Sequence, residues 1–460
     1  MEGSVRKVGD DLRITTQLID TRTGDHLWSE TYDGKYTMAI FDFQSSVAKK
    51  VAASLNAVIT PQEAKRIDLK PTSEVLAYDL CSRGNEMVRK WRFTHDSLYL
   101  RLALNLFSKA QITDPEYLDA LAGKNMTYTE AGTYDSAMFY AKRIQEVDPE
   151  NSMGPLGIGS IYLYSSKYDS AYKYYQEANN LAPNQPWTNL AIGQTIFFSG
   201  SDIIRALPYY QKAYDLGGDS EVEINTNIAY LYFQFGDYQK ALKYLKNALF
   251  LRSECDIIIQ YDNILSVQGR YAEAIQFLDS ICGLNACEQK CDIEKFHIYT
   301  STKEFNKAEK FYNKALKAGY KREGEKDLYI KNADENDLYI GYMYRETGRK
   351  KESLSILNEF IKRDKNDLSY NNSSLGRSII NLHLAAAYAI LEDKKNTLLY
   401  LTEFEKSITV EEPFTISSFP GFDKMRDNPG FKAIVKRIED KKASLRAKVK
   451  EMEQRKELSL

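Results

Sequence analysis

Three cysteines and a histidine lie within one short segment and could bind a metal or exchange electrons. They are Cys282, Cys287, Cys291 and His297. Thiolate and imidazole ligands suit tetrahedral zinc, but spacings of five and four residues differ from the usual Cys-x2-Cys pattern. A disulfide from Cys282 to Cys287 or Cys291 is the second alternative. The odd total of five cysteines fits a reducing compartment slightly better. We therefore expect unpaired thiols and predict no metal site, with these four residues as the weak zinc candidate.

Other chemistry is poorly represented in the sequence. None of the four histidines has a partner at the His-Glu-x-x-His spacing of a metal-binding helix. No phosphate-binding glycine loop and no Gly-x-Ser-x-Gly turn occurs, and the Gly-x-Gly of residues 156–160 falls inside an expected helix. We predict no catalytic residues, no cofactor and no enzymatic activity.

The elements that position these residues are predicted by an internal repeat. Alanines recur at steps of 34, 34, 35, 35, 33 and 34 residues. Most of them follow an aromatic residue and a polar pair, and the others stand at the equivalent place in their repeat. They stand at positions 103, 137, 171, 206, 241, 274 and 308, and weaker echoes follow at Ser353 and Thr397. A self-similarity of this period indicates a repeat protein.

Other positions keep the same phase as the alanines. Bulky residues follow four positions later, further alanines seven positions later, and aromatic residues precede by nine. Such spacings place residues on one helical face, so each repeat carries two amphipathic helices. Gly200, Gly236, Gly269 and Gly348 fall between the paired helices, where a left-handed turn is needed.

The pattern resembles the tetratricopeptide repeat family. Six residues of one repeat match that consensus position for position: Gly159, Tyr162, Ala171, Tyr175, Ala178 and Pro183. The resemblance implies a mainly all-α fold, a right-handed α-solenoid with about nine repeats across residues 75–408. Insertions at 320–333 and 366–377 are expected to be longer loops or extended helix ends.

In this family the first helix of each repeat lines a concave groove. For the central repeats the resemblance assigns a peptide-binding groove to Tyr164, Trp187, Gln194, Phe198, Glu223, Tyr230, Phe233 and Gln234. The lysine and asparagine residues with which chaperone-binding members clamp a carboxylate terminus are not matched. An aromatic surface with amide groups suits an extended peptide or a partner helix. The alternative for each aromatic is a place in the core between repeats.

Residues 1–62 differ from the repeats. Alternating residues predict strands at 4–7, 12–19 and 26–32, and helical spacing follows from 40 to 56.

Segments such as Leu12–Asp20 and Gly24–Asp33 resemble the second half of the TolB amino-terminal-like α/β domain, here a small N-terminal α/β module. In that family the domain precedes tetratricopeptide repeats in bacterial signalling proteins, often behind a winged-helix or cyclase module. The first half of the domain does not appear before residue 2. We therefore expect an unpaired strand edge that pairs with another copy, as a homo-oligomer, or packs loosely.

Residues 409–460 are expected to end the array. Asp427 or Asn428 can cap a helix with Pro429 in its first turn, and the apolar face of that helix would cover the last repeat. The mixed charges of 441–460 predict a frayed helical end.

Charge and hydropathy exclude two classes of partner for this region. Lys plus Arg number 62 against 64 Asp plus Glu, for a net charge of −2, which argues against direct nucleic-acid binding. No run of about 18 apolar residues is present, so no membrane span is expected.

The sequence therefore predicts a non-enzymatic scaffold that binds a protein or peptide partner. By resemblance, it is the sensory or regulatory part of a bacterial signalling protein; the alternative is the effector-binding half of a transcription regulator that holds a small ligand. We expect a cytoplasmic location, or an extracytoplasmic one if a membrane segment lies upstream.

Overall fold

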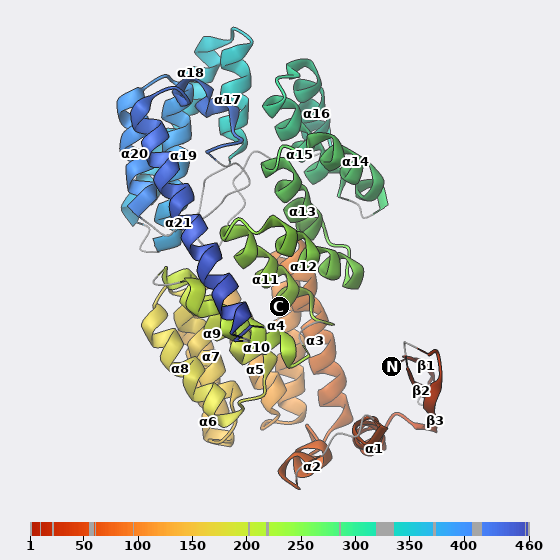
Figure 1. Cartoon of the computed structure of the whole chain (residues 1–460). Helices are drawn as coiled ribbons and strands as arrows, with labels where there is room; N and C mark the ends of the chain where they lie inside the picture. The colour runs from red at the N-terminus through yellow and green to blue at the C-terminus, as the bar shows by residue number, and fades with distance from the viewer. Residues whose placement is uncertain are drawn as a thin grey trace. The chain divides into compact units, whose positions relative to one another are not determined.

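The computed structural model consists almost entirely of helices that pack in antiparallel pairs, with one small sheet (Figure 1). It describes residues 2–9, 11–20, 23–54, 59, 61–94, 96–200, 203–217, 220–284, 287–318, 335–370, 374–406, 416–455 and 457–458. Two compact units are present, an N-terminal unit (Met1–Ile161) and a C-terminal unit (Tyr162–Leu460). The predicted fold class is confirmed. The division between the units falls within the repeats, so the predicted three-part division at 62 and 408 stays a prediction.

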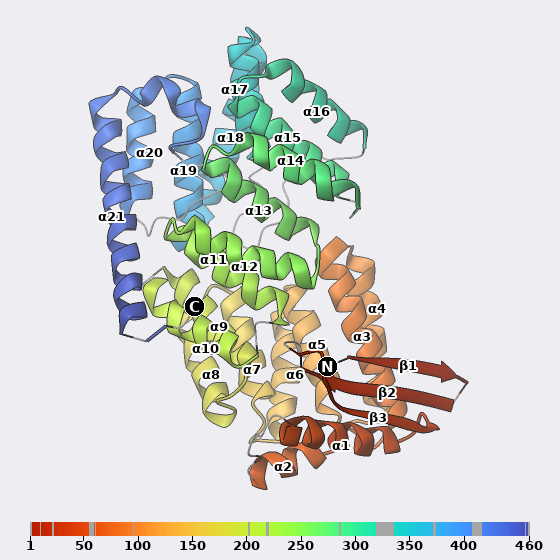
Figure 2. The same ribbon diagram turned by 45° about the vertical axis from the view of Figure 1, so that its right-hand side comes forward.

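The N-terminal unit begins with an antiparallel sheet in the order β1-β2-β3 (Figure 2). Its strands are β1 (Glu2–Val8), β2 (Asp11–Ile19) and β3 (His26–Lys35), followed by α1 (Ala39–Ser54). Leu12 on β2 is buried against Ile40 and Phe41 of α1. All seven residues of β1 are exposed, and β1 forms one edge of the sheet. The predicted strands, hairpin and helix are therefore confirmed, and the outer edge of β1 is free of partners among the described residues.

The helices of the N-terminal unit lie where the repeat spacing predicts them. They are α2 (Pro61–Asp68), α3 (Val75–Thr94), α4 (Ser97–Thr113), α5 (Leu118–Glu130), α6 (Tyr134–Val147) and most of α7 (Met153–Tyr164), whose last three residues belong to the C-terminal unit. Ala103, Phe107 and Ala110 of α4 are fully buried. A Cβ at Gly84 or Gly123 would lie 2.6 or 2.4 Å from the ring of Phe107. The small residues thus make room for the large aromatic that fills the space between repeats.

The C-terminal unit contains the remaining helices. They are α8 (Tyr168–Leu181), α9 (Pro186–Ser199), η1 (Ile203–Ala206), α10 (Leu207–Asp215), α11 (Val222–Gln234), α12 (Tyr238–Leu251), α13 (Cys255–Val267), α14 (Tyr271–Ile281), η3 (Cys282–Leu284), α15 (Glu288–Ser301), α16 (Phe305–Lys317), α17 (Asn336–Glu346), α18 (Lys350–Tyr370), α19 (Ser374–Ile390), α20 (Lys394–Lys406), η4 (Pro420–Met425) and α21 (Pro429–Gln454). The repeat alanines Ala171, Ala206 and Ala241 are completely buried. The alanines that recur in the sequence are therefore the residues at which the helices pack against one another.

Left-handed residues join the paired helices at the predicted places. Gly200, Gly236, Gly269 and Gly348 have φ values of 68°, 72°, 72° and 86°. Lys303 occupies the equivalent place in another repeat, with a φ of 62°. The turn geometry is thus common to the repeats, and glycine meets it at least cost.

The described parts of the second insertion, 366–370 and 374–377, are helical. α18 extends to Tyr370 and α19 begins at Ser374, so this insertion lengthens helix ends. The insertion predicted at 320–333 lies outside the described residues. No helix in the described part of the chain is both long and apolar enough to cross a bilayer.

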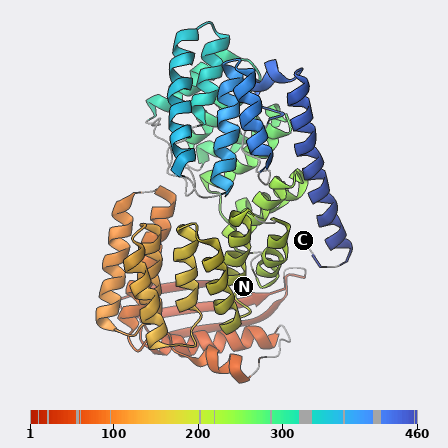
Figure 3. The same cartoon turned by 90° about the vertical axis from the view of Figure 1, so that its left-hand side faces the viewer.

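The tail differs from the prediction. Asn428 caps α21 as expected, its Oδ1 accepting from Phe431 N at 3.1 Å. However, α21 continues to Gln454 instead of fraying after 441. Within the C-terminal unit α21, the dark blue helix of Figure 3, runs from beside α20 to the turn between α11 and α12. There Arg446 Nη1 donates to Phe235 O at 2.8 Å. Val449 is only 5% exposed, so apolar burial and this hydrogen bond hold the charged helix in place.

Candidate functional site

The cysteines form disulfides, which corrects the expectation of unpaired thiols. Cys255 is bonded to Cys287 with a Cα–Cα distance of 5.6 Å, and Cys282 is bonded to Cys291 at 6.3 Å. Both distances lie in the ordinary range for disulfides. Cys255 begins α13, 27 residues before Cys282, and its place beside Cys287 is set by the packing of α13 on α15. The sequence alone did not show this pairing.

The weak zinc candidate is excluded by the same bonds. With Cys282, Cys287 and Cys291 oxidised, no thiolate remains for a metal beside His297. Among the described residues no group of three His, Cys, Asp or Glu side chains is arranged to hold a metal ion. Cys81 is the free cysteine; burial raises the pKa of its thiol to about 12, so it is poorly reactive.

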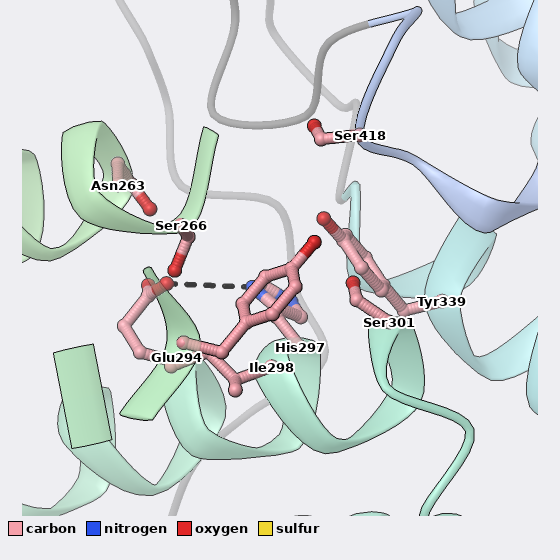
Figure 4. A pocket seen from close by; sticks show the side chains of 9 residues that line it. Asn263, Ser266, Glu294, His297, Ile298, Ser301, Tyr339 and Ser418 are labelled. Atoms are coloured by element: carbon pink, nitrogen blue, oxygen red, sulfur yellow. Dashed lines mark ion pairs between the residues drawn. The ribbon is translucent and has the colours of Figure 1, made fainter. Parts of the chain in front are cut away.

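A polar hollow lies between the helices that the disulfides join (Figure 4). α13 and α15 form its walls together with α14 and α17, and its volume of about 20 Å³ has room for about one water molecule. It is lined by Asn263, Ser266, Tyr271, Glu294, His297, Ile298, Ser301, Tyr339 and Ser418. Hydroxyl, carboxylate and imidazole groups converge here from segments up to 155 residues apart, between Asn263 and Ser418.

His297 is held on three sides in this hollow. Its Nδ1 lies 3.5 Å from Oε2 of Glu294, one turn earlier on α15, and its Nε2 lies 2.5 Å from Oδ1 of Asn336. The ring of Tyr339 stacks on the imidazole with centroids 4.0 Å apart. Burial opposes the charged ring, but hydrogen bonds to Glu294 and Asn336 and the charges of Glu294 and Glu335 outweigh it and raise the pKa of His297 to about 8. The ring is therefore an imidazolium at neutral pH, with both nitrogens directed at acceptors.

Asp262 lies behind the wall formed by α13. It is 0% exposed, and neither carboxyl oxygen has a hydrogen-bond partner among the described residues. Burial, and then the negative charge of Glu294, raise the pKa of Asp262 well above its usual range. Ser266 stands four residues later on the same helical face and lines the hollow, so Asp262 belongs to the same cluster.

This arrangement suits binding better than catalysis. A general base needs a free, unprotonated nitrogen near a proton to be removed. Both nitrogens of His297 face acceptors, and at neutral pH the ring is already protonated. What the hollow offers instead is a charged wall with several hydroxyl groups.

The predicted groove residues all lie in the C-terminal unit, and the structure divides them. Trp187 is 43% exposed at the start of α9. Tyr164, Gln194, Phe198, Glu223 and Tyr230 are half-buried. Phe233 and Gln234 are 6% and 1% exposed. Their assignment to a binding surface is wrong, because the last turn of α11 is enclosed by neighbouring helices.

An amide contact joins the two inner helices of the predicted groove. Gln194 Nε2 on α9 donates to Asn227 Oδ1 on α11 at 3.1 Å, and Asn227 Nδ2 donates to Glu223 O at 2.7 Å. Tyr230 packs against Phe197 with ring centroids 5.5 Å apart. Half-buried amides and aromatic rings therefore lie together on successive repeats.

Comparison with known proteins supports the repeats. The tetratricopeptide repeat family model matches residues 156–185, 222–255 and 297–318. The chain thus contains tetratricopeptide repeats. Proteins with such repeats generally act as protein-interaction scaffolds.

One curated relative and several solved structures are similar to parts of the chain. A Rhizobium meliloti (strain 1021) protein named "Putative adenylate cyclase 3" is 35% identical over 88 residues, 19% of this chain and 15% of that protein. The chain therefore matches only a small part of that relative. A thermophilic tetratricopeptide repeat protein of Thermus thermophilus is 20% identical, covering 41% of this chain and 98% of that one, with a TM-score of 0.36. The Cut9–Hcn1 hetero-tetramer of the APC/C is 16% identical, covering 79% and 59%, with a TM-score of 0.42.

Proposed function

We propose that the chain is a non-enzymatic scaffold whose α9 and α11 bind an extended segment of a partner protein. The observation that carries the proposal is the amide contact between Gln194 and Asn227, with the exposed Trp187 about two helical turns before Gln194 on α9. Amide side chains can hydrogen-bond a peptide backbone whatever its sequence, and a large aromatic ring can anchor a side chain.

We further propose that this scaffold is the sensory or regulatory part of a bacterial signalling protein. The 88-residue similarity to the Rhizobium meliloti protein, whose name assigns it to the cyclases, supports that context. The two disulfides favour an oxidising compartment for the C-terminal unit, against the cytoplasmic location expected from the sequence.

The binding proposal is tested with a displayed library of random peptides selected on the full chain. Affinities of the enriched peptides are then compared for the parent, Trp187→Ala and Phe250→Ala. Phe250 is a matched control because it is an aromatic residue, 91% exposed at the end of α12, and lies on neither α9 nor α11. We expect Trp187→Ala to weaken binding about tenfold or more, as loss of an aromatic anchor does. Equal affinities for the parent and Trp187→Ala would refute the assignment.

A second candidate function rests on a different observation, the hollow around His297. An effector-binding role would require this hollow, which has room for about one water molecule, to widen around a small molecule that its converging polar groups would then hold. Ligand-induced protection of α13 and α15 in hydrogen exchange would support this role, and unchanged exchange at saturating ligand would contradict it.

A further inference from the structure

Two repeats of the C-terminal unit carry the same cluster of stacked aromatic rings and lysines. In the repeat formed by α11 and α12, the rings of Tyr232 and Tyr244 are stacked with centroids 5.9 Å apart. Lys240 Nζ lies 4.8 Å from the centre of the Tyr232 ring, and Lys243 Nζ lies 5.2 Å from that of Tyr244. Both distances are within the range of a cation–π contact. We call these four residues the α11–α12 platform.

The repeat formed by α15 and α16 has an equivalent set, the α15–α16 platform. Tyr299 and Phe311 stack with centroids 5.4 Å apart. Lys307 Nζ lies 5.1 Å from the centre of the Tyr299 ring, and Lys310 Nζ lies 6.0 Å from that of Phe311. Each of the four residues follows its counterpart by 67 positions, the sum of the repeat steps of 33 and 34. The two platforms therefore occupy the same place in their repeats.

A helix of the chain itself is seated at the α11–α12 platform. Glu453, in the last turn of α21, forms an ion pair with Lys240. Arg446, seven residues earlier on α21, donates to the backbone oxygen of Phe235 in the turn between α11 and α12. Val449, which lies between the two charged residues, is 5% exposed. This platform thus shows the kind of ligand that such a set can hold: a helix that brings a carboxylate to the lysine.

The α15–α16 platform is accessible. Tyr299 and Phe311 are half-buried and Lys310 is exposed, and the side chain of Lys307 is 58% exposed. Lys307 pairs with Glu304, just before the start of its own helix, at 2.6 Å. An exposed ion pair of this kind contributes little to stability. A carboxylate of a partner can therefore take the place of Glu304 at small cost.

Charge and the shape of the turn select the partner. α16 carries four lysines and one glutamate, so its surface favours an acidic ligand. Lys303 stands at the position that Gly236 has in the other repeat, 67 residues earlier. A Cβ at Gly236 would lie 2.6 Å from Arg446 Nη1, and Lys303 has both a Cβ and a positive charge. The α21 helix of a second copy, which brings Arg446 to this turn, therefore fits the α15–α16 platform poorly.

We propose that the α15–α16 platform binds an acidic amphipathic helix of a partner protein. Lys307 and Lys310 pair with carboxylates of that helix, and the stacked rings of Tyr299 and Phe311 pack against its apolar side chains. This site goes beyond the scaffold role proposed above, which assigns an extended segment to α9 and α11.

The test is fluorescence anisotropy of the full chain with a labelled helical peptide of about 18 residues. The peptide carries glutamate and leucine along one face, and a matched peptide has glutamine in place of each glutamate. The platform variant combines Lys307→Gln with Lys310→Gln. The control variant combines Lys351→Gln with Lys362→Gln, which removes the same charge from exposed positions on α18.

We expect saturable binding of the glutamate peptide and much weaker binding of the glutamine peptide. The platform variant should weaken binding of the glutamate peptide about fivefold or more, and the control variant less than about twofold. Phe311→Leu should weaken it as well, since the ring would lose its contact with the helix, and a purely ionic attachment would not show this loss. Trp187→Ala should leave the affinity unchanged.

The proposal is overturned if the glutamate peptide does not bind, if the two peptides bind equally, or if the platform and control variants behave alike. An equal loss with Trp187→Ala would place the peptide on α9 and α11 and would also overturn it. A dimer in sedimentation that the platform variant abolishes would identify a second copy as the occupant, against the proposal. Failure of the α9–α11 proposal is distinguishable, because it is measured with selected peptides and Trp187→Ala.

Discussion

The bond between Cys255 and Cys287 should contribute strongly to the stability of the segment that contains the hollow. It closes a loop with a sequence separation of 32, and the bond between Cys282 and Cys291 closes one of 9. The loop-entropy relation then gives about 3.7 kcal/mol for the longer loop and about 2.6 kcal/mol for the shorter one. These values are upper limits that do not add, because the two loops overlap in sequence.

The perturbation is the paired substitution Cys255→Ser with Cys287→Ser, which removes the longer crosslink without leaving a new thiol. Repeat arrays can open in sections, so the opening free energy is read from amide hydrogen exchange in α13 and α15. We expect this opening free energy to be about 2–4 kcal/mol lower in the variant than in the parent. Reductant should lower it in the parent as well. Cys81→Ala is the control, because Cys81 lies outside both bonds; its response to reductant should equal the parent's.

Thiol titration decides whether this reasoning is right. In denaturant without reductant the chain should show one free thiol, that of Cys81, and five after reduction. Five free thiols in protein prepared under oxidising conditions would refute the pairing. One free thiol, with unchanged exchange in the paired serine variant, would refute the assigned contribution to stability.

Three further predictions concern other parts of the chain. The pKa of His297, about 8, is above the unfolded value of about 6.5, so its stabilisation is complete below pH 6.5 and is lost as pH rises through 8. Opening of α15 should cost up to about 2 kcal/mol less at pH 9 than at pH 6, and a flat profile would contradict this. Gly236→Ala should destabilise more than Gly269→Ala in urea unfolding, because both have φ +72° but only the first Cβ would meet Arg446, at 2.6 Å from Nη1; equal losses would contradict the docking of α21. Pairing of copies through the edge of β1 predicts a dimer mass in sedimentation, and a monomer at high concentration would contradict it.

The repeat architecture could be predicted from the sequence because the residues that recur at a fixed spacing are the ones that pack between the helices. Ala171, Tyr175 and Ala178 lie on one helical face, and all three are buried in the structure. Left-handed turns were likewise predictable at glycine, whose lack of a Cβ suits them.

The hollow could not be predicted, because its residues are brought together only by tertiary packing. Glu294 and His297 are one helical turn apart, but Asn336 and Ser418 come from later segments. No local spacing signals such a set. The one local hint was His297 itself, which was grouped with three cysteines that turned out to be in disulfides, Cys282 with Cys291 and Cys287 with Cys255.

The limits of the groove prediction have a similar cause. Each inner helix packs against the repeats before and after it. Helical spacing alone therefore does not show which of its residues are buried and which are exposed. Phe233 and Gln234 follow Tyr230 by three and four residues, yet they are buried while Tyr230 is half-buried. The course of α21 was missed for another reason: its many charges hide the few apolar contacts, such as that of Val449, that fix it.

Site-specific photocrosslinking tests the central claim, that α9 and α11 bind an extended peptide, most directly. A benzophenone amino acid replaces Trp187 in one variant and Phe250 in another, and each is irradiated with a peptide selected on the parent chain. We predict a crosslink from position 187 that unlabelled peptide competes away, and none above background from position 250. Equal crosslinking from both positions, or crosslinking from 250 alone, would contradict the account.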